Sequence, residues 1–206
     1  MNASSFLELV EARYRELHDY ADHGQVKRAG PGGECNFTTD YHQGGTFRFR
    51  AWFGHPYRPL RHMIFRHEIG MDQSKAPYSV SQFHEDAAQR REEESLAMAI
   101  AGATGISHGS AHTIGTLLFQ DVGGMPLKNW KRLRFRRMRD VDGVLCITIS
   151  GRRPSAGRML ACFGAEDLLL RRLQWKFTKG HRSEKRRVID KAVFTSASSA
   201  LPGIAA

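Results

Sequence analysis

The spacing of apolar residues changes from helical to strand-like within the first third of the chain. Apolar residues recur at helical spacing from Phe6 to Tyr20 behind a capping box at Ser5–Glu8, which predicts a helix over 6–20 ended by Asp22–Gly24. Apolar residues then recur at every second position, as in a half-buried strand. Strands are therefore expected at 25–28, 34–40, 46–53, 61–69 and 78–83. The clearest alternation is TFRFRAWF at 46–53, where the phenylalanines share one face.

A run of small apolar residues interrupts the strands. SLAMAIAGA at 95–103 follows a strongly charged stretch whose acids suit a helix N-terminus, so it predicts a helix that ends at Gly105. A second short helix is expected from Ser110 or Ala111 to Phe119. The middle of the chain is therefore a helical segment between two sets of strands.

In the last third of the chain, apolar and polar residues alternate again. Strands are expected at 132–140, 144–150, 158–163, 168–178 and 185–194, with a hairpin turn at Asp142-Gly143. This order contains no βαβ alternation, so it predicts an α+β fold, a curved antiparallel sheet covered on one face by the N-terminal helix and the central helical segment. A length of 206 residues suits one domain, expected over 1–195, with 196–206 as a flexible tail.

The charge is concentrated in one half of the chain. The formal net charge is +10, and 128–191 holds 19 Lys and Arg against 6 Asp and Glu, leaving 12 against 15 elsewhere. A basic half attracts polyanions such as nucleic acid, anionic lipid or acidic proteins. In KRLRFRRMRD at 131–140, a strand places Arg132, Arg134 and Arg136 on one face, where they could contact an anion or a partner. A solvated edge strand is the alternative, and no nucleic-acid-binding signature accompanies the run.

The segment from Gly105 to Gly109 matches G-x-S-x-G, the nucleophile elbow of serine hydrolases. A triad could combine Ser107 with His181 and an acid among Asp140, Asp142 and Asp167. The residues before Ser107 have helical composition, whereas the elbow needs a buried strand there. A Gly/Ser linker between two helices, with Gly105 as C′ and Ser107 or Ser110 as an N-cap, is therefore favoured over the hydrolase.

Other residues that could carry chemistry are sparse. His108 and His112 have metal-pair spacing without the glutamate of H-E-x-x-H, and His55, His62 and His67 are expected at the surface, so no metal or cofactor is predicted. The chain has three cysteines and no C-x-x-C. Cys146 and Cys162 fall on expected strands joined by the loop at 151–157. The sequence is compatible both with a disulfide between them and with two buried free thiols.

The large aromatic residues lie on amphipathic strands at both ends of the chain. They could form an ordinary core between sheet and helices, or line an apolar cavity of a curled sheet that holds a hydrophobic ligand. The residues in question are the aromatic Phe47, Phe49, Phe53, Trp175 and Phe177, together with the apolar Leu173.

The whole pattern resembles the LolA-like family of outer-membrane lipoprotein carriers and sorting proteins. Three stretches carry the likeness, namely the helix that ends in Y-x-D-x-G-x-V at 20–26, TFRFRAWF at 46–53, and the small-residue helical segment at 95–119. VDGVLCITISG and LLLRRLQWKF fit the final hairpins of the family. The likeness covers residues 6 to 194.

The resemblance implies an incomplete barrel with a helical lid, binding a lipid, an acyl chain or a lipid-modified protein without catalysis. The aromatic residues named above would then line the cavity, and the basic half could meet an anionic membrane surface. The lid would present Leu96, Met98, Ile100, Leu117 and Leu118. The resemblance also implies the periplasm or cell envelope, although no signal peptide or lipobox cysteine is recognisable in the sequence.

Overall fold

The structure is a computed structural model. It describes residues 1–28, 34–54, 64–72, 75–84, 86–119, 122, 127–153, 157–176 and 182–195. The phenylalanine at 177, the histidines at 55, 62 and 181, and the tail at 196–206 lie outside these ranges.

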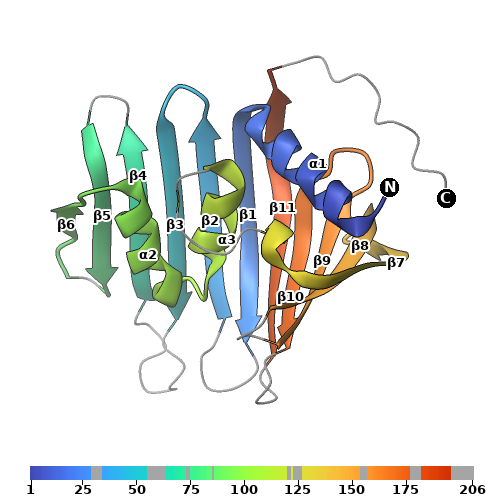
Figure 1. Ribbon diagram of the computed structural model, residues 1–206. Helices are drawn as coiled ribbons and strands as arrows, with labels where there is room; N and C mark the ends of the chain where they lie inside the picture. The colour runs from blue at the N-terminus through green and yellow to red at the C-terminus, as the bar shows by residue number, and fades with distance from the viewer. Residues whose placement is uncertain are drawn as a thin grey trace.

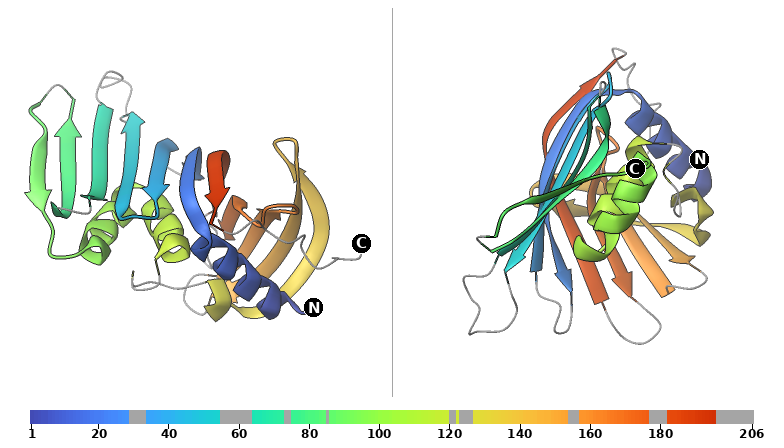
Figure 2. Two further views of the ribbon diagram at one scale, coloured as in Figure 1. Left: turned by 90° about the horizontal axis from the view of Figure 1, so that it is seen from above. Right: turned by 90° about the vertical axis from the view of Figure 1, so that its left-hand side faces the viewer.

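The described residues form one antiparallel sheet of eleven strands with helices on one face (Figures 1 and 2). The helices are α1 (Ala3–Arg15), α2 (Leu96–Ile106), α3 (Ser110–Leu118) and a short 3₁₀ turn, η2 (Leu127–Asn129). The first set of strands is β1 (Leu17–Arg28), β2 (Glu34–His42), β3 (Thr46–Gly54), β4 (Ile64–Asp72), β5 (Lys75–Phe83) and β6 (Gln89–Glu92). The second set is β7 (Lys131–Val141), β8 (Val144–Arg153), β9 (Gly157–Gly164), β10 (Leu170–Lys176) and β11 (Arg182–Phe194).

Two meanders meet in the middle of this sheet. The strand order is β6-β5-β4-β3-β2-β1-β11-β10-β9-β8-β7, so the first and the last strands of the chain are neighbours. β1 pairs with β2 on one side and with β11 along most of its length on the other. The sheet is open, with β6 and β7 at its two edges, and the expected α+β fold with an incomplete barrel is confirmed.

Strand alternation decides which face of the sheet is covered. Cross-strand neighbours Phe37, Ala51 and His67 face the helices and are buried, whereas the adjacent row of Arg50 and Glu68 faces away from them. The core lies between that covered face and the helices. It contains Phe6, Val10 and Tyr14 of α1, Ile100 of α2 and Ile114 of α3, all almost fully buried.

The first helix is shorter than the sequence predicts. It ends at Arg15, and its N-cap is Asn2, whose Oδ1 accepts hydrogen bonds from the amides of Ser4 and Ser5 at 3.0 and 2.9 Å. Leu17 and Tyr20 continue the helical spacing but belong to β1, where Tyr20 pairs with Tyr41 of β2. Pairing on both sides of β1 overrides the local helical pattern.

The central helices agree more closely with expectation. Ser95 caps α2 by accepting a hydrogen bond from the Met98 amide at 3.2 Å, and α3 begins at Ser110. The missed element is β6, whose four residues are all exposed and offer no apolar pattern to recognise. Within the described residues, none of the helices has the length and apolar character needed to cross a membrane.

Candidate functional site

The aromatic side chains of β3 lie in the interior beneath the helices. Phe47 and Phe49 are almost fully buried. The Phe49 ring stacks on Phe37 with centroids 5.9 Å apart, and the Phe47 ring meets Phe119 edge-on at 5.1 Å. Phe119 directly follows α3, so the sheet aromatics contact the helical segment itself. The described aromatic rings of this interior thus pack against one another and against the end of α3.

The other expected lining residues lie on the same face but farther along the sheet. Phe53 is half-buried beside Phe65, with ring centroids 5.4 Å apart. Leu173 of β10 is buried, and the half-buried Trp175 ring lies 6.2 Å from that of Trp130. Three strands, β2, β1 and β11, separate the β3 and β10 residues. The set therefore forms two ends of one long apolar face, not one compact pocket.

Four of the five expected lid residues face the sheet. Ile100, Leu117 and Leu118 are buried and Leu96 is half-buried. Met98 is the exception, because its side chain is 54% exposed and points away from the core. The helix buries Ala99, Ile100 and Ala103 along one side, and this periodicity turns position 98 outward.

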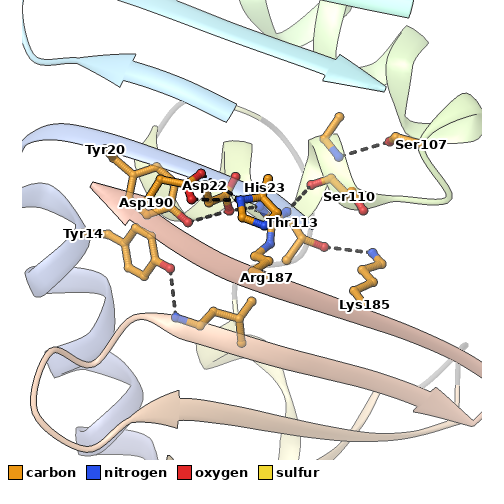
Figure 3. Close-up of polar contacts among 12 residues, drawn as sticks. Tyr14, Tyr20, Asp22, His23, Ser107, Ser110, Thr113, Lys185, Arg187 and Asp190 are labelled. Carbon is orange, nitrogen blue, oxygen red and sulfur yellow. Dashed lines mark hydrogen bonds and ion pairs between the residues drawn. The ribbon is translucent and has the colours of Figure 1, made fainter. Parts of the chain in front are cut away.

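A buried ion pair lies under the corner between α2 and α3 (Figure 3). The Arg187 guanidinium of β11 donates to the Asp22 carboxylate of β1, and both side chains are essentially inaccessible to solvent. The Tyr20 hydroxyl donates to the same carboxylate at 2.7 Å. Burial, followed by the Asp22 charge, raises the pKa of Tyr20 well above its ordinary value. The arginine also donates to the Ser110 carbonyl at 3.0 Å, which ties the sheet to the first turn of α3.

A second cation of β11 reaches the same corner. The Lys185 ammonium, almost fully buried, donates to the Thr113 hydroxyl at 3.0 Å. Gly109 has a φ of +81°, and a Cβ there would lie 2.9 Å from the Lys185 Nζ. The left-handed backbone conformation favours glycine at this turn, and a larger residue would also displace the Lys185 ammonium.

Sequence reasoning missed this polar cluster. Lys185 and Arg187 stand two apart in a strand, and that pattern normally marks a solvated face. Asp22 could have indicated the cluster from the sequence. It occupies the same alternating positions of β1 as Tyr20 and Val26, which face the core, so a buried carboxylate with a partner could be expected there. Figure 3 shows the two cations of β11 pointing toward the α2–α3 corner.

Ser107 lacks the geometry of a nucleophile elbow. It is the C-cap of α2, is fully buried, and accepts a hydrogen bond from the Ala111 amide at 3.1 Å. A helix precedes it where the elbow needs a strand. Of the proposed acids, Asp140 and Asp142 lie at the β7–β8 turn and Asp167 pairs with Arg171. The serine lies in a linker between two helices, as expected, but the expected N-cap is wrong, because Ser107 is the C-cap of α2 and Gly109 the N-cap of α3.

The basic strand β7 lies at a sheet edge with its arginines exposed. Arg134 and Arg136 pair with Ser150 and Thr148 of β8, two apart on both strands, and so share a face as expected. The Arg136 Nε donates to the Ser150 hydroxyl at 2.8 Å. Arg132 lies in a register shift with a φ of +55°, so the simple alternation does not extend to it.

The cysteines do not form the disulfide that the sequence allowed. Register places Cys146 opposite Gly164 and Cys162 opposite Thr148, so the two thiols are not cross-strand partners. All three cysteines are free and buried. Burial raises the pKa of Cys35 and of Cys146 to about 12.

The expected surface position of His67 is wrong. Its side chain is buried on the covered face, with Nδ1 2.9 Å from the Ser81 hydroxyl. Burial lowers its pKa below the ordinary value. His108 lies in the α2–α3 turn and His112 within α3, and both are half-buried.

Two hollows lie on the face of the sheet away from the helices. One, of about 750 Å³, is lined by Arg136, Leu160, Gln174 and Glu184 among others. These residues alternate with buried core residues on their strands. The other, of about 780 Å³, lies over β1, β2 and β3 and includes Asp19, His42 and Arg48 in its lining. Charged side chains line both hollows, and Met159, Leu160 and Trp175 add apolar surface to the first.

Comparison with known proteins identifies the architecture. No family model and no curated protein matches the sequence. LprF of Mycobacterium bovis superposes with a TM-score of 0.54 at 10% identity, over 99% of this chain and 97% of its own. The chain has a LolA-like fold. The lipoprotein LppX of Mycobacterium tuberculosis superposes at 0.49 with 13% identity, over 93% and 98% of the two chains.

The LolA-like fold was expected from the sequence, and at the level of the fold the resemblance is confirmed. At identities this low the likeness establishes the architecture, and the chemistry must be argued from this chain's own residues. The helix-covered face and its α2–α3 corner are the parts of the LolA-like fold here that carry both apolar area and buried charge.

Proposed function

We propose that the protein binds the acyl chain of a lipid or a lipid-modified protein between the sheet and the α2–α3 segment, without catalysis. The observation that carries this is the continuous apolar layer from Phe47 and Phe49 to Leu173, which α1, α2 and α3 cover (Figure 1). A LolA-like fold supports the same role. Each buried CH₂ of a ligand would contribute about 0.8 kcal/mol.

Entry of a chain requires the helical segment to move. Phe119 lies between α3 and the sheet, where its ring contacts both Tyr41 and Phe47. Small residues make up much of α2–α3, and the large buried side chains that hold it on the sheet are Ile100, Ile114, Leu117 and Leu118. A ligand chain would replace contacts that Phe119 and its neighbours now make.

The first experiment is native mass spectrometry of the purified full chain, followed by organic extraction. We expect a co-purified lipid near one equivalent, or uptake of added fatty acids with affinity rising about fourfold per CH₂ of chain length. A clean apo mass, together with no uptake of any member of a fatty-acid and phosphatidylglycerol series, would contradict the proposal.

Two variants test where the ligand chain binds. Phe119→Ala opens space next to Phe47 and should change the affinity for long chains, whereas Met98→Ala lies on the outer side of α2 and should bind as the wild type does. Equal behaviour of the two variants would mean that the chain is held elsewhere. Both keep the buried ion pair and should fold.

The β7–β8 hairpin supports a second element of this function, contact with an anionic bilayer. Arg134, Arg137 and Arg139 are exposed at the sheet edge, next to Met138 and Leu145 at 42% and 56% exposure. Cations beside exposed apolar side chains suit the boundary between anionic headgroups and acyl chains, where each Lys or Arg is worth about 1 kcal/mol. A lipid carrier must approach such a surface to exchange its load.

The matched test uses the two opposite edges of the sheet. The double variant Arg134→Gln/Arg137→Gln should bind vesicles containing phosphatidylglycerol about thirtyfold more weakly. Arg91→Gln on β6 should leave binding unchanged. Binding to phosphatidylcholine vesicles should be weak throughout. Equal loss in both variants, or preference for an oligonucleotide over the vesicles, would contradict the bilayer as partner.

A further inference from the structure

Three potential metal ligands converge where β1 begins and β2 ends. His18, Asp19 and His42 each offer one ligand atom, and these atoms lie within 4.8 Å of one another. The His42 Nδ1 is 2.7 Å from one Asp19 carboxylate oxygen, and the His18 Nδ1 is 3.4 Å from the other. We propose that these three side chains form a binding site for a divalent transition-metal ion of the zinc type.

A local irregularity of β1 creates this arrangement. Successive residues of a regular strand point to opposite faces, which would separate His18 from Asp19. The register of β1 against β11 shifts between Leu17 and Asp19, and such a bulge redirects side chains. Asp19 is also directly opposite His42 in the pairing with β2. The Gln43 amide donates to the His18 carbonyl at 2.7 Å and holds the end of the strand in place.

The site lies on the face away from the helices. Asp19 and His42 alternate with Tyr20 and Tyr41, which face the core. An ion bound here is therefore separated by the sheet from the apolar interior. The inference does not depend on lipid binding, and either can fail without the other.

The ligand set and its geometry suit zinc. Zn²⁺ takes imidazole nitrogen and carboxylate oxygen at about 2.0–2.2 Å, which puts tetrahedral ligand atoms about 3.3 Å apart. The distances of 2.7 Å from His42 and 3.4 Å from His18 run to different oxygens of Asp19, and one ligand atom from each of the three residues lies within 4.8 Å of the others. The two imidazole rings are nearly perpendicular, at 85°, with centroids 4.6 Å apart. Small movements of the side chains would place one ion among the three atoms now held together by hydrogen bonds.

The site is accessible and keeps open coordination positions. The three side chains are 44%, 21% and 48% exposed, in the order His18, Asp19, His42. The hollow of about 780 Å³ begins at Asp19 and His42. Three protein ligands with solvent at the remaining positions are typical of zinc sites that exchange a water or a small ligand.

One neighbouring cation competes with the proposed ion. The Lys191 ammonium lies 2.9 Å from the Asp19 carboxylate and its side chain is 56% exposed, so it can swing into solvent. Removal of Lys191 should eliminate its ion pair with Asp19 and so strengthen metal binding by that carboxylate.

The test is calorimetric titration of the full chain with zinc chloride. Wild-type protein should bind one ion at this site, and His42→Ala and His18→Ala should each weaken that binding at least tenfold. Lys191→Met should strengthen it severalfold. His23→Ala is the matched control, because His23 lies on the same strand and contacts a single carboxylate, Asp190, at 2.9 Å without a third ligand (Figure 3).

Cobalt supplies a second measurement that a change in stability would not mimic. Co²⁺ in the wild type should give the visible absorption of a low-coordinate nitrogen and oxygen site, and the band should vanish in His42→Ala. Circular dichroism confirms that each variant is folded. Zinc binding that is as strong in His42→Ala as in the wild type, or weakened equally by His23→Ala, would overturn the proposal.

Discussion

Arg187 and Asp22 form an ion pair that is almost completely excluded from solvent, between the central strands and the corner of α2 and α3. The pair joins β11 to β1 at the point where the two halves of the sheet meet. The Arg187 guanidinium also donates a hydrogen bond to the Ser110 carbonyl, which fixes the start of α3 relative to the sheet. One side chain thus links the two meanders and the segment proposed to cover the ligand.

Removal of the arginine should destabilise the fold strongly. Arg187→Met leaves the Asp22 carboxylate buried without its partner, and breaking a buried pair in this way costs about 3–5 kcal/mol of unfolding free energy. Urea unfolding measures the change. Adding Asp22→Asn to that variant should recover part of the loss, since the uncompensated charge is removed.

A neighbouring arginine provides the control for this prediction. Arg186 pairs with Glu184 and Asp142 on the outer face, with its side chain 45% exposed. Arg186→Met should cost no more than about 1 kcal/mol, as exposed pairs do. A loss for Arg187→Met as small as that for Arg186→Met would contradict the structural role assigned to the buried pair.

The buried thiols give a prediction about chemical reactivity. With the pKa of Cys35 and of Cys146 raised to about 12 by burial, little thiolate forms near neutral pH and reagents cannot reach the sulfur. A disulfide-exchange reagent should therefore label none of the three cysteines rapidly in the native protein and all three after unfolding without reductant. Titration of only one thiol in the unfolded protein would reveal a disulfide instead.

The sequence predicts those parts of the fold where local pattern and tertiary environment agree. The alternation around Phe47 and Phe49 and the small residues from 95 to 103 predict a strand and a helix that the structure confirms. It fails at Tyr20, because helical spacing continues by coincidence into a strand stabilised by pairing on both sides. Helix propensity is a weak preference compared with such pairing.

The same reasoning explains why parts of the site were missed. Lys185 and Arg187 alternate as on a solvated strand, yet β11 lies inside the sheet beside the central strand β1 and turns both side chains inward. The His18, Asp19 and His42 group depends on a bulge and on strand register. Neither can be read from spacing within one segment. Central position in the sheet, not local composition, decides these contacts.

The serine of the G-x-S-x-G segment should show no nucleophilic reactivity. Ser107 is buried, and its oxygen already accepts the Ala111 amide hydrogen at the start of α3. A fluorophosphonate probe should leave the native protein unlabelled at this residue. Ser107→Ala should lower stability by about 1 kcal/mol through loss of a cap. Labelling that disappears in Ser107→Ala would instead establish a hydrolase site.

His67 should make stability depend on pH. Burial lowers the pKa of His67 below 6.5, with the nearby Glu93 charge acting in the opposite direction. The unfolded chain binds a proton at the ordinary value of about 6.5 while the folded chain does not, so unfolding takes up a proton and stability falls as pH falls. The loss begins as pH drops through about 6.5 and continues down to the folded pKa. The uncharged Nε2 has no hydrogen-bond partner in the described structure, which is why protonation there is unfavourable.

Two variants separate the imidazole from its surroundings. His67→Asn keeps a polar group near Ser81 but cannot titrate, so the slope of unfolding free energy between pH 7.5 and 5 should be smaller than in the wild type. Ser81→Ala removes the 2.9 Å contact and keeps the imidazole, so it should lower stability at every pH and retain the slope. Denaturant unfolding across this pH range measures both. Identical slopes in His67→Asn and the wild type would mean that His67 is protonated in the folded protein as readily as in the unfolded chain.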